Sequence, residues 1–245
     1  DNDGDTVSVD VSGNFSDPDA SDTLRFSATG LPPGLSIDPG TGVISGTIDA
    51  DASVSGPYSV TVTADDGSGL PNSSQSDSFT WTVGNPPPVA TDDTDSTDED
   101  TAISRDAASG VLPNDNDPDG DTLTVSQVDG GPGNVGAAVA GSTGGLFTIN
   151  ADGSYDFDPD GDFESLALGE STTSTVSYEV SDGEGGTDMA TLTVTITGAN
   201  DQPVLDVPLP DQNDNDGDTV SVDVSGNFSD PDASDTLRFS ATGLP

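Results

Sequence analysis

Residues 189–197 read Met-Ala-Thr-Leu-Thr-Val-Thr-Ile-Thr, with an apolar side chain at every second position and threonine between them. A period of two is typical of a β-strand that buries one face. Helical periodicity is nearly absent from the rest of the chain, so the sequence predicts an all-β fold. The clearest predicted strands are residues 6–15, 23–29, 42–47, 58–64, 78–83, 122–128, 146–150, 154–158, 175–181, 189–197 and 204–210.

Two connectors divide these strands into groups. The proline-rich stretch Asn85-Pro86-Pro87-Pro88 is the first, and Asn200-Asp201-Gln202-Pro203 is the second. Segments of roughly 100 residues with short alternating strands and closely spaced turns predict tandem immunoglobulin-like, or cadherin-like, Greek-key β-sandwiches. We expect residues 1–84 to form a sandwich that lacks its first strand and residues 85–200 to form a second sandwich. Residues 201–245 then begin a further copy of the first.

The reason for expecting a further copy is an internal repeat. Residues 1–32 reappear without a change as residues 214–245, at an offset of 213 positions. Identity of this length indicates duplication within a tandem array, so the chain is expected to be a window on a longer protein. We expect residues 201–245 to be either disordered or docked onto another chain by strand exchange, because 201–245 supply only the first strands of a sandwich.

The charge is extreme, with 46 acidic residues against three arginines and a formal net charge of −43. Nucleic acid and anionic lipid are therefore poor partners. Of the acids 41 are Asp, the residue that bends turns and binds hard cations. The chain has neither Cys nor His, which excludes disulfides, thiolate chemistry and the usual zinc ligands. Calcium-rich, salty surroundings fit this composition, and no apolar run approaches the roughly 20 residues of a membrane-spanning helix.

Several motifs resemble known bacterial modules. In the first segment, residues 15–19 (Phe-Ser-Asp-Pro-Asp), 30–38 and 41–47 resemble the dystroglycan-type cadherin-like, or Ig-type, domain. In the second, residues 114–123, 151–155, 180–188 and 195–201 resemble a VCBS or bacterial cadherin-like repeat. The resemblance implies a module of giant calcium-dependent adhesins of the RTX type, in which such domains form a long extracellular stalk at the bacterial surface. The glycine-rich nonapeptides of the export-proximal β-roll are not present, which implies the extender region.

Aspartates recur at equivalent places in the two segments. Asp17-Pro18-Asp19 and Asp117-Pro118-Asp119 both precede Asp-Thr-Leu and a strand, and Asp66-Gly67 and Asp182-Gly183 both follow a penultimate strand. In a sandwich, these two loops meet at the same end. Calcium binds about six to eight oxygens, so a site needs several Asp or Asn from adjacent loops. The sequence therefore predicts calcium as the cofactor.

The cadherin-like resemblance implies that calcium lies at junctions between domains. One junction would gather Asp3, Asp49 or Asp51, and Asn85 with Asp117, Asp119 and Asp182. The next would gather Glu99, Asp100, Asn200, Asp201, Asp230 and Asp232. Near these positions, Asp98 and Glu164 lie in the same predicted turns. The complete set of predicted ligands adds Asp5, Asp17, Asp19, Asp66 and Asp121.

Other interpretations remain open for these residues. The aspartates can instead be turn residues on a halophile-like acidic surface, and Asp10, Asp38 and Asp152 are expected to have that structural role. Trp81 is expected to pack in a core rather than stack on a sugar, and Tyr58, Tyr155 and Tyr178 are expected to be strand residues. No pair of carboxylates stands out as a glycosidase acid and nucleophile.

The sequence thus predicts a non-enzymatic extender module of an extracellular bacterial adhesin, stiffened by calcium, whose partners are the neighbouring repeats of the same polypeptide. The alternative is a calcium-dependent carbohydrate-binding or cell-adhesion module, which an extracellular polysaccharide-degrading enzyme could also carry. The ligand of the whole protein lies outside this sequence.

Overall fold

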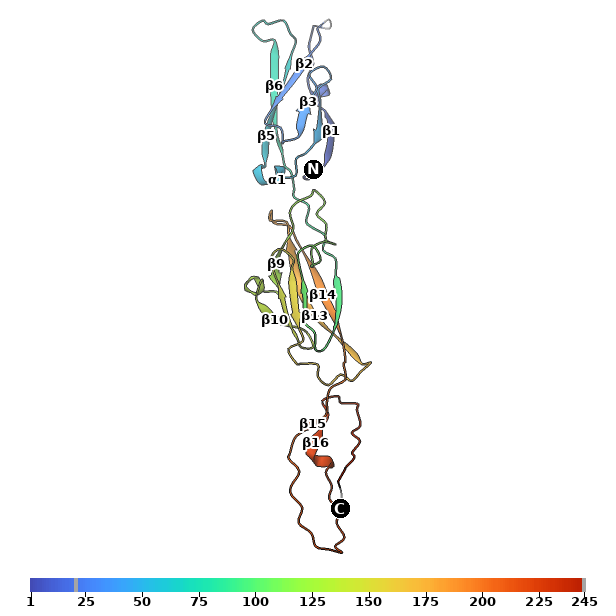
Figure 1. The fold of residues 1–245 in the computed structure, drawn as a ribbon. Helices are drawn as coiled ribbons and strands as arrows, with labels where there is room; N and C mark the ends of the chain where they lie inside the picture. Colours follow the sequence, from blue (N-terminus) through green and yellow to red (C-terminus); the bar gives the residue numbers. More distant parts are fainter. Residues whose placement is uncertain (20–21, 244–245) are drawn as a thin grey trace. The chain divides into compact units, whose positions relative to one another are not determined.

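The computed structural model describes residues 1–19 and 22–243 and is built almost entirely of β-strands (Figure 1). Ala20, Ser21, Leu244 and Pro245 lie outside the described residues. The chain forms two compact units. Unit 1 consists of residues 1–90, 114–124 and 180–188, and unit 2 consists of residues 91–113, 125–179 and 189–245. No helix in the described part of the chain has the length and apolarity needed to cross a membrane.

Residues 1–84 contain two three-stranded antiparallel sheets. One sheet has the order β1 (Thr6–Asp10), β4 (Val43–Thr47) and β3 (Leu35–Ile37). The other has the order β2 (Arg25–Thr29), β5 (Tyr58–Asp65) and β6 (Ser74–Trp81). The connections include the 3-10 helix η1 (Ser12–Asn14) and the single-turn helix α1 (Ala52–Ser55). The predicted strands at 23–29, 42–47, 58–64 and 78–83 are confirmed in position, whereas β3 was not predicted.

The core between these sheets follows the predicted alternation. Ile44 and Val60 are fully buried, and Trp81 is 7% exposed and donates a hydrogen bond from Nε1 to Asp1 Oδ2 at 3.0 Å. The expectation that Trp81 is a core residue is confirmed. Phe79 lies on the same side of β6 but remains 40% exposed, because β6 is an edge strand of its sheet in the described chain.

Strand β1 ends five residues before the predicted limit of 15. The reason is local, since Asp10 Oδ1 accepts a hydrogen bond from the backbone N–H of Ser12 at 2.9 Å and turns the chain into η1. Asp38 in the same way accepts from Gly40 N and Thr41 N, both at 2.8 Å. Asp152 accepts from Ser154 N at 3.0 Å. The structural role expected of these three aspartates is confirmed.

Residues 93–197 contain two four-stranded sheets. The first has the order β10 (Ala138–Ala140), β11 (Leu146–Ile149), β12 (Tyr155–Asp158) and β8 (Ile103–Arg105). The second has the order β7 (Asp93–Asp98), β14 (Thr187–Thr197), β13 (Ser171–Ser181) and β9 (Thr124–Val128). The 3-10 helix η2 (Pro132–Asn134) follows β9. The alternating residues of β13 and β14 are buried on one face, with Tyr178, Leu192 and Ile196 fully buried.

Strand β7 pairs in parallel with β14, with Asp93–Asp98 opposite Leu192–Thr197. Its sequence, Asp-Thr-Asp-Ser-Thr-Asp, carries no apolar residue, and sequence patterning did not predict it. Hydrogen bonds replace apolar packing on its inner face. Asp93 Oδ2 accepts from the Tyr178 hydroxyl at 2.7 Å, and Asp95 Oδ2 accepts from the Tyr155 hydroxyl at 2.6 Å.

Asp95 also forms a bidentate ion pair with Arg105, with Nε 2.8 Å from Oδ2 and Nη2 2.9 Å from Oδ1. Burial raises the pKa of Asp95, but the hydrogen bonds from Arg105 and Tyr155 outweigh burial and lower the pKa overall. Asp95 is therefore ionised when it holds β7 against the neighbouring sheet. Tyr155 and Tyr178 are strand residues, as expected, and both are buried.

Residues 201–243 form an open segment with little strand structure (Figure 1). The predicted strand 204–210 was wrong in length, because only β15 (Val204–Leu205) pairs, antiparallel to β16 (Phe228–Ser229). Pro208 and Pro210 have no backbone N–H to donate to a β-ladder, so strand β15 cannot extend through residues 208–210 with regular pairing. The 3-10 helix η3 (Ser225–Asn227) precedes β16.

Candidate metal centres

The first acidic cluster lies within unit 1 and comprises Asp3, Asp51, Asp117, Asp119, Asp121, Asp182 and Glu184, with Asn85 beside them. Carboxylate oxygens of Asp117, Asp119 and Asp121 lie within 4.8 Å of one another. The same is true of Asp51, Asp121 and Glu184. Asp121 belongs to both groups, so the two groups share a ligand position.

Two loops of similar design place most of these side chains. Asp117 Oδ1 accepts backbone hydrogen bonds from Asp119, Gly120 and Asp121 at 3.1, 3.2 and 3.4 Å. Asp182 Oδ1 accepts from Glu184, Gly185 and Gly186 at 2.8, 3.0 and 3.0 Å. Each aspartate thus folds the loop around one of its oxygens. These hydrogen bonds fix the backbone of both loops, and the fixed backbone positions the carboxylates of Asp119, Asp121 and Glu184.

Several other oxygens of the first cluster are buried without a hydrogen-bond donor among the described residues. Asp3 is 4% exposed and Asp117 is 8% exposed, and within the described residues neither Oδ2 has a partner. Asp3 Oδ1, in contrast, accepts from Ser53 N at 2.9 Å. Both oxygens of Asp119, Oδ2 of Asp121 and Oδ1 of Asn85 also lack a partner in the part of the chain that the structure describes. Buried carboxylates without donors carry a large desolvation cost, and a cation is the usual compensation.

The pKa shifts in the first acidic cluster show that its carboxylates repel one another and that burial disfavours their charge. Burial, followed by the proximity of Asp117, raises the pKa of Asp119 to about 7. Burial and the charges of Asp117 and Asp51 also raise the pKa of Asp121. Asp117 has the opposite shift, because hydrogen bonds from the 119–121 segment outweigh its burial and lower its pKa. At neutral pH, negative charge in this cluster therefore needs a counter-charge.

We predict that the calcium-free chain becomes more stable as the pH falls from about 8 toward 5. The pKa of Asp119 is about 7 in the folded chain against 3.8 as its ordinary value. Folding therefore takes up a proton, and this contribution is complete below the unfolded pKa and is lost as the pH rises through about 7. Denaturant midpoints measured in chelator across this interval test the prediction. A midpoint that climbs with pH would contradict it.

The second acidic cluster lies within unit 2 and comprises Glu99, Asp100, Glu164, Asp201 and Asp232, with Asp230 beside it. Carboxylate oxygens of Glu99, Asp201 and Asp232 lie within 4.8 Å of one another, and so do those of Asp100, Glu164 and Asp201. Asp201 is shared by both groups. This arrangement repeats the overlap seen at Asp121 in the first acidic cluster.

Two carboxylates of the second acidic cluster are buried more deeply than any in the first. Glu99 is 2% exposed, and its Oε1 accepts from Ala199 N at 2.8 Å. Asp232 is 1% exposed, and its Oδ2 accepts from Asp201 N at 3.0 Å. Within residues 1–19 and 22–243, no donor reaches Glu99 Oε2, Asp232 Oδ1 or Asp201 Oδ2. Burial and the charges of Asp201 and Glu164 raise the pKa of Glu99, which again indicates uncompensated charge.

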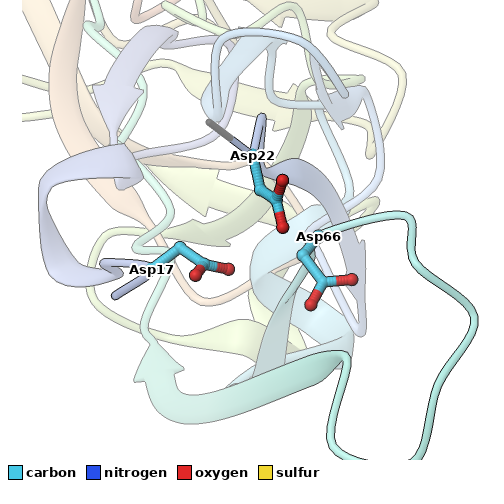
Figure 2. Close-up of side chains that lie close together, drawn as sticks. All are labelled: Asp17, Asp22 and Asp66. Carbon is cyan, nitrogen blue, oxygen red and sulfur yellow. The ribbon is translucent and has the colours of Figure 1, made fainter. Parts of the chain in front are cut away.

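The third acidic cluster comprises Asp17, Asp22 and Asp66, whose oxygens also lie within 4.8 Å of one another (Figure 2). It differs from the other two in exposure, since Asp22 is exposed and Asp17 and Asp66 are half-buried. Asp17 Oδ1 accepts from Asp19 N at 2.8 Å, and Asp66 Oδ1 accepts from Ser68 N at 2.7 Å. In the described chain it contributes no buried oxygen without a donor, so its geometry alone does not distinguish a metal site from a turn.

Some predicted ligands lie outside these groups. Asp5 Oδ2 accepts from Asn2 N at 2.7 Å and closes a turn. Asp19 and Asp49 are exposed and belong to no group of three carboxylates in the described chain. Asn200 is exposed, and its Nδ2 donates to Asp201 O at 2.7 Å. Asp230 Oδ1 accepts from Asp232 N at 3.2 Å and shapes the loop of the second acidic cluster.

The structure also adds residues that were not among the predicted ligands. Asp22 occupies the Asp-Thr-Leu position that Asp121 occupies in the second segment, so a closer comparison of the two motifs finds it. Glu184 follows Asp182 at the spacing that separates Asp119 from Asp117. Glu164 is predicted to lie in the relevant turn, and the structure makes it a candidate ligand as well.

Family comparisons match the two sequence segments separately. The sequence model described as "Bacterial cadherin-like domain" matches residues 85–198, and the one described as "Putative Ig domain" matches residues 1–84. We call residues 85–198 the cadherin-like domain and residues 1–84 the Ig domain, after the models that match them. Cadherin-like domains generally bind calcium and are typically extracellular and non-enzymatic. No curated protein matches the sequence significantly.

Solved structures with detectable similarity include cadherin ectodomains. Drosophila N-cadherin EC1-4 is 18% identical over 74% of this chain and 42% of its own, with a TM-score of 0.28. Human protocadherin-24 EC1-2 is 17% identical over 76% and 87%, with a TM-score of 0.29. An endo-fucoidan hydrolase of glycoside hydrolase family 107 is 17% identical over 80% and 31%, with a TM-score of 0.26. The chain spans 42%, 58% and 37% of the first three cadherin structures.

Proposed function

We propose that the chain is a non-enzymatic extender module of a large adhesin at the bacterial cell surface, in which calcium holds successive domains together. The observation that carries this proposal is the set of buried carboxylate oxygens without donors in the first and second acidic clusters. On a purely solubilising acidic surface the carboxylates stay hydrated, so they carry no desolvation cost. Here Asp3, Glu99 and Asp232 are at least nine-tenths buried.

The residues of the first acidic cluster fit a hard cation. Asp3 and Asp51 come from the Ig domain, whereas Asp117, Asp119, Asp121 and Glu184 come from the cadherin-like domain. Asn85 stands at the connector, and its Nδ2 donates to Asp182 Oδ2 at 2.8 Å. The buried Oδ1 of Asn85 is the neutral oxygen that calcium sites commonly include. A cation shared by both domains would fix the connector between them.

The residues of the second acidic cluster fit the same role. Glu99, Asp100 and Glu164 belong to the cadherin-like domain, whereas Asp201 belongs to the connector and Asp232 to the following segment. When bound, calcium would supply positive charge and direct coordination to these oxygens. The chain itself buries Glu99 and Asp232. The hydrogen bond from Asp201 N to Asp232 Oδ2 keeps the connector beside the following segment, so that the carboxylate oxygens stay close together.

The carbohydrate-binding alternative needs an exposed aromatic platform, and the aromatic residues considered for it are not exposed. Trp81, Tyr155 and Tyr178 are 7%, 4% and 0% exposed. Tyr58 is half-buried, and its hydroxyl donates to Ala52 O at 2.6 Å. These four residues therefore support the sandwich cores, and the extender proposal is the better account of the chain.

Calcium titration tests the proposal. We expect added calcium to raise the melting temperature of the chelator-treated chain, with a stabilisation of about 2.7 kcal/mol at 100 times the dissociation constant of one site. Small-angle scattering should show a narrower distribution of particle lengths in calcium than in chelator. Magnesium and sodium chloride at matched ionic strength are the controls, because magnesium prefers octahedral sites that retain water. Equal stabilisation by all three salts would identify a screened acidic surface instead.

A further inference from the structure

Strand β13 has an outer edge that strand β9 covers in part. β13 is 11 residues long and lies between β14 and β9, whereas β9 has five residues. Just after β9, Asp129 N donates to Ser177 O at 2.8 Å. Along a strand, every second residue presents its backbone N–H and C=O to the same edge. Thr175 and Thr173 therefore face the same edge as Ser177, at a point that β9 does not reach.

The turn between β10 and β11 covers this stretch, and we call its residues the 141–145 loop. Ser142 N donates to Thr175 O at 3.0 Å, and Thr175 N donates in return to Ser142 Oγ at 3.0 Å. The Thr143 hydroxyl donates to Thr173 O at 2.7 Å. A turn that belongs to one sheet thus occupies backbone groups of β13 in the other sheet, where β9 has ended.

Close packing fixes the position of the 141–145 loop. Ser174 is fully buried, and its hydroxyl donates to Gly144 O at 2.7 Å. A Cβ atom on Gly141 would lie 2.1 Å from Ser174 Oγ, and one on Gly145 would lie 2.6 Å from the ring of Phe157. The close approach of neighbouring side chains therefore requires glycine at both positions. The loop is a packed element of the domain.

The 141–145 loop covers the edge of β13 without presenting a regular edge of its own. Gly141 N donates to Gly145 O at 2.9 Å, and Gly144 N donates to Gly141 O at 3.2 Å. Gly145 N donates to Asp162 Oδ2 at 2.8 Å. Together with Ser142 N, four of the five backbone N–H groups of the loop donate within the domain. A regular strand in this place would present a new row of N–H and C=O groups to the solvent.

We propose that the 141–145 loop blocks strand addition at β13, and so prevents this strand from pairing with the same strand of a second copy of the domain. β13 contains a single charged residue, Glu179, and neither Gly nor Pro. Low charge and β-branched residues favour strand addition. In a chain with a net charge of −43, repulsion between copies is weak at this strand. The inference goes beyond the extender function, in which tandem copies would hold identical strands at high local concentration.

A double variant, Ser142→Ala with Thr143→Val, removes the oxygen that accepts from Thr175 N and the hydroxyl that donates to Thr173 O. Both changed residues are exposed, so the domain should stay folded. We expect the Thr175 amide to exchange its hydrogen about tenfold faster. Sedimentation velocity in millimolar calcium should show dimers and larger species at concentrations where the parent chain is monomeric. Thr148→Val, which removes a hydroxyl from β11 in the other sheet, is the control.

Further variants separate an uncovered edge from general instability. Gly141→Val displaces the loop through the contact with Ser174 and should also associate, whereas Gly133→Val should not, because a Cβ atom on Gly133 would meet nothing within 4 Å. Ile149→Ala destabilises the core, since Ile149 is fully buried, but leaves the hydroxyl contacts of the loop in place.

Three outcomes would overturn the proposal. The first is a double variant that exchanges faster at Thr175 yet remains monomeric at every concentration. The second is unchanged exchange at Thr175, which would show that the 141–145 loop does not cover the edge. The third is equal association of Ile149→Ala and the double variant, which would assign the association to unfolding. None of these outcomes bears on the calcium titration.

Discussion

Replacing Asp119 by Asn is expected to raise the melting temperature of the calcium-free chain and to lower it in excess calcium. Without calcium, the change removes a buried carboxylate whose two oxygens have no donor among the described residues and whose pKa is raised to about 7. With calcium, the same change removes a charged ligand. Each tenfold loss in affinity then removes about 1.4 kcal/mol of stabilisation. The sign of the effect therefore depends on the cation.

Asp156→Asn is the matched control for this experiment. Asp156 is exposed on β12 and belongs to no carboxylate group of the described residues. It should change the melting temperature little, and equally, in both conditions. Calorimetry of the two variants in chelator and in calcium gives four comparisons. A destabilising effect of Asp119→Asn in chelator would show that Asp119 has a structural donor, and would remove the main support for the first centre.

The second large effect is expected in the core of the cadherin-like domain. Phe147→Ala should destabilise this domain by about 3–5 kcal/mol, the usual cost of deleting a buried aromatic ring. Phe147 is fully buried and lies opposite Phe157 across β11 and β12, with ring centroids 4.6 Å apart. Urea unfolding followed by circular dichroism measures the loss.

Leu168→Ala provides the comparison, because Leu168 is 77% exposed and should cost less than about 0.5 kcal/mol. Similar costs for the two variants would mean that the β11–β12 region does not form the core described above.

The sequence predicted the strands whose inner faces are apolar, and it failed where another interaction holds the strand. β5, β13 and β14 follow the period of two and were found. β7 has only polar residues, and its pairing depends on Tyr178, Tyr155 and Arg105, which lie about 10 to 85 positions away. Periodicity reports burial of apolar area, so it cannot detect a strand whose inward side chains are half-buried carboxylates in hydrogen bonds.

For the acidic clusters, sequence predicted which loops meet but not which carboxylate of each loop points inward. Asp117 and Asp119 were predicted together and lie together, and Asp121, predicted as a ligand without a place in either junction, lies beside them. Asp5 and Asp49 were predicted from the same kind of turn, yet they lie outside every group within the described residues. The spacing of aspartates specifies the turn. Which oxygens the backbone N–H groups occupy, and which are left over, depends on the folded loop.

The two copies of the repeat show which structures form from neighbouring residues alone and which need a distant pairing partner. Asp10 accepts from Ser12 N, and Asp223 accepts from Ser225 N, both at 2.9 Å, so the turn and its 3-10 helix form in both copies. Strands β1 and β2, by contrast, form only in the first copy, where β4 and β5 are available. Sequence alone therefore predicts the turns of this chain more reliably than its strand pairs.

The parallel pairing of β7 with β14 has a mechanical consequence. Because the two strands run in the same direction, the chain enters the domain at one end of this pair and leaves it at the other. A pulling force applied along the polypeptide loads the six residue pairs between Asp93–Asp98 and Leu192–Thr197 in shear, all at once. Antiparallel strands joined at a hairpin would instead open one pair at a time. The domain is thus built to bear tension between its two ends.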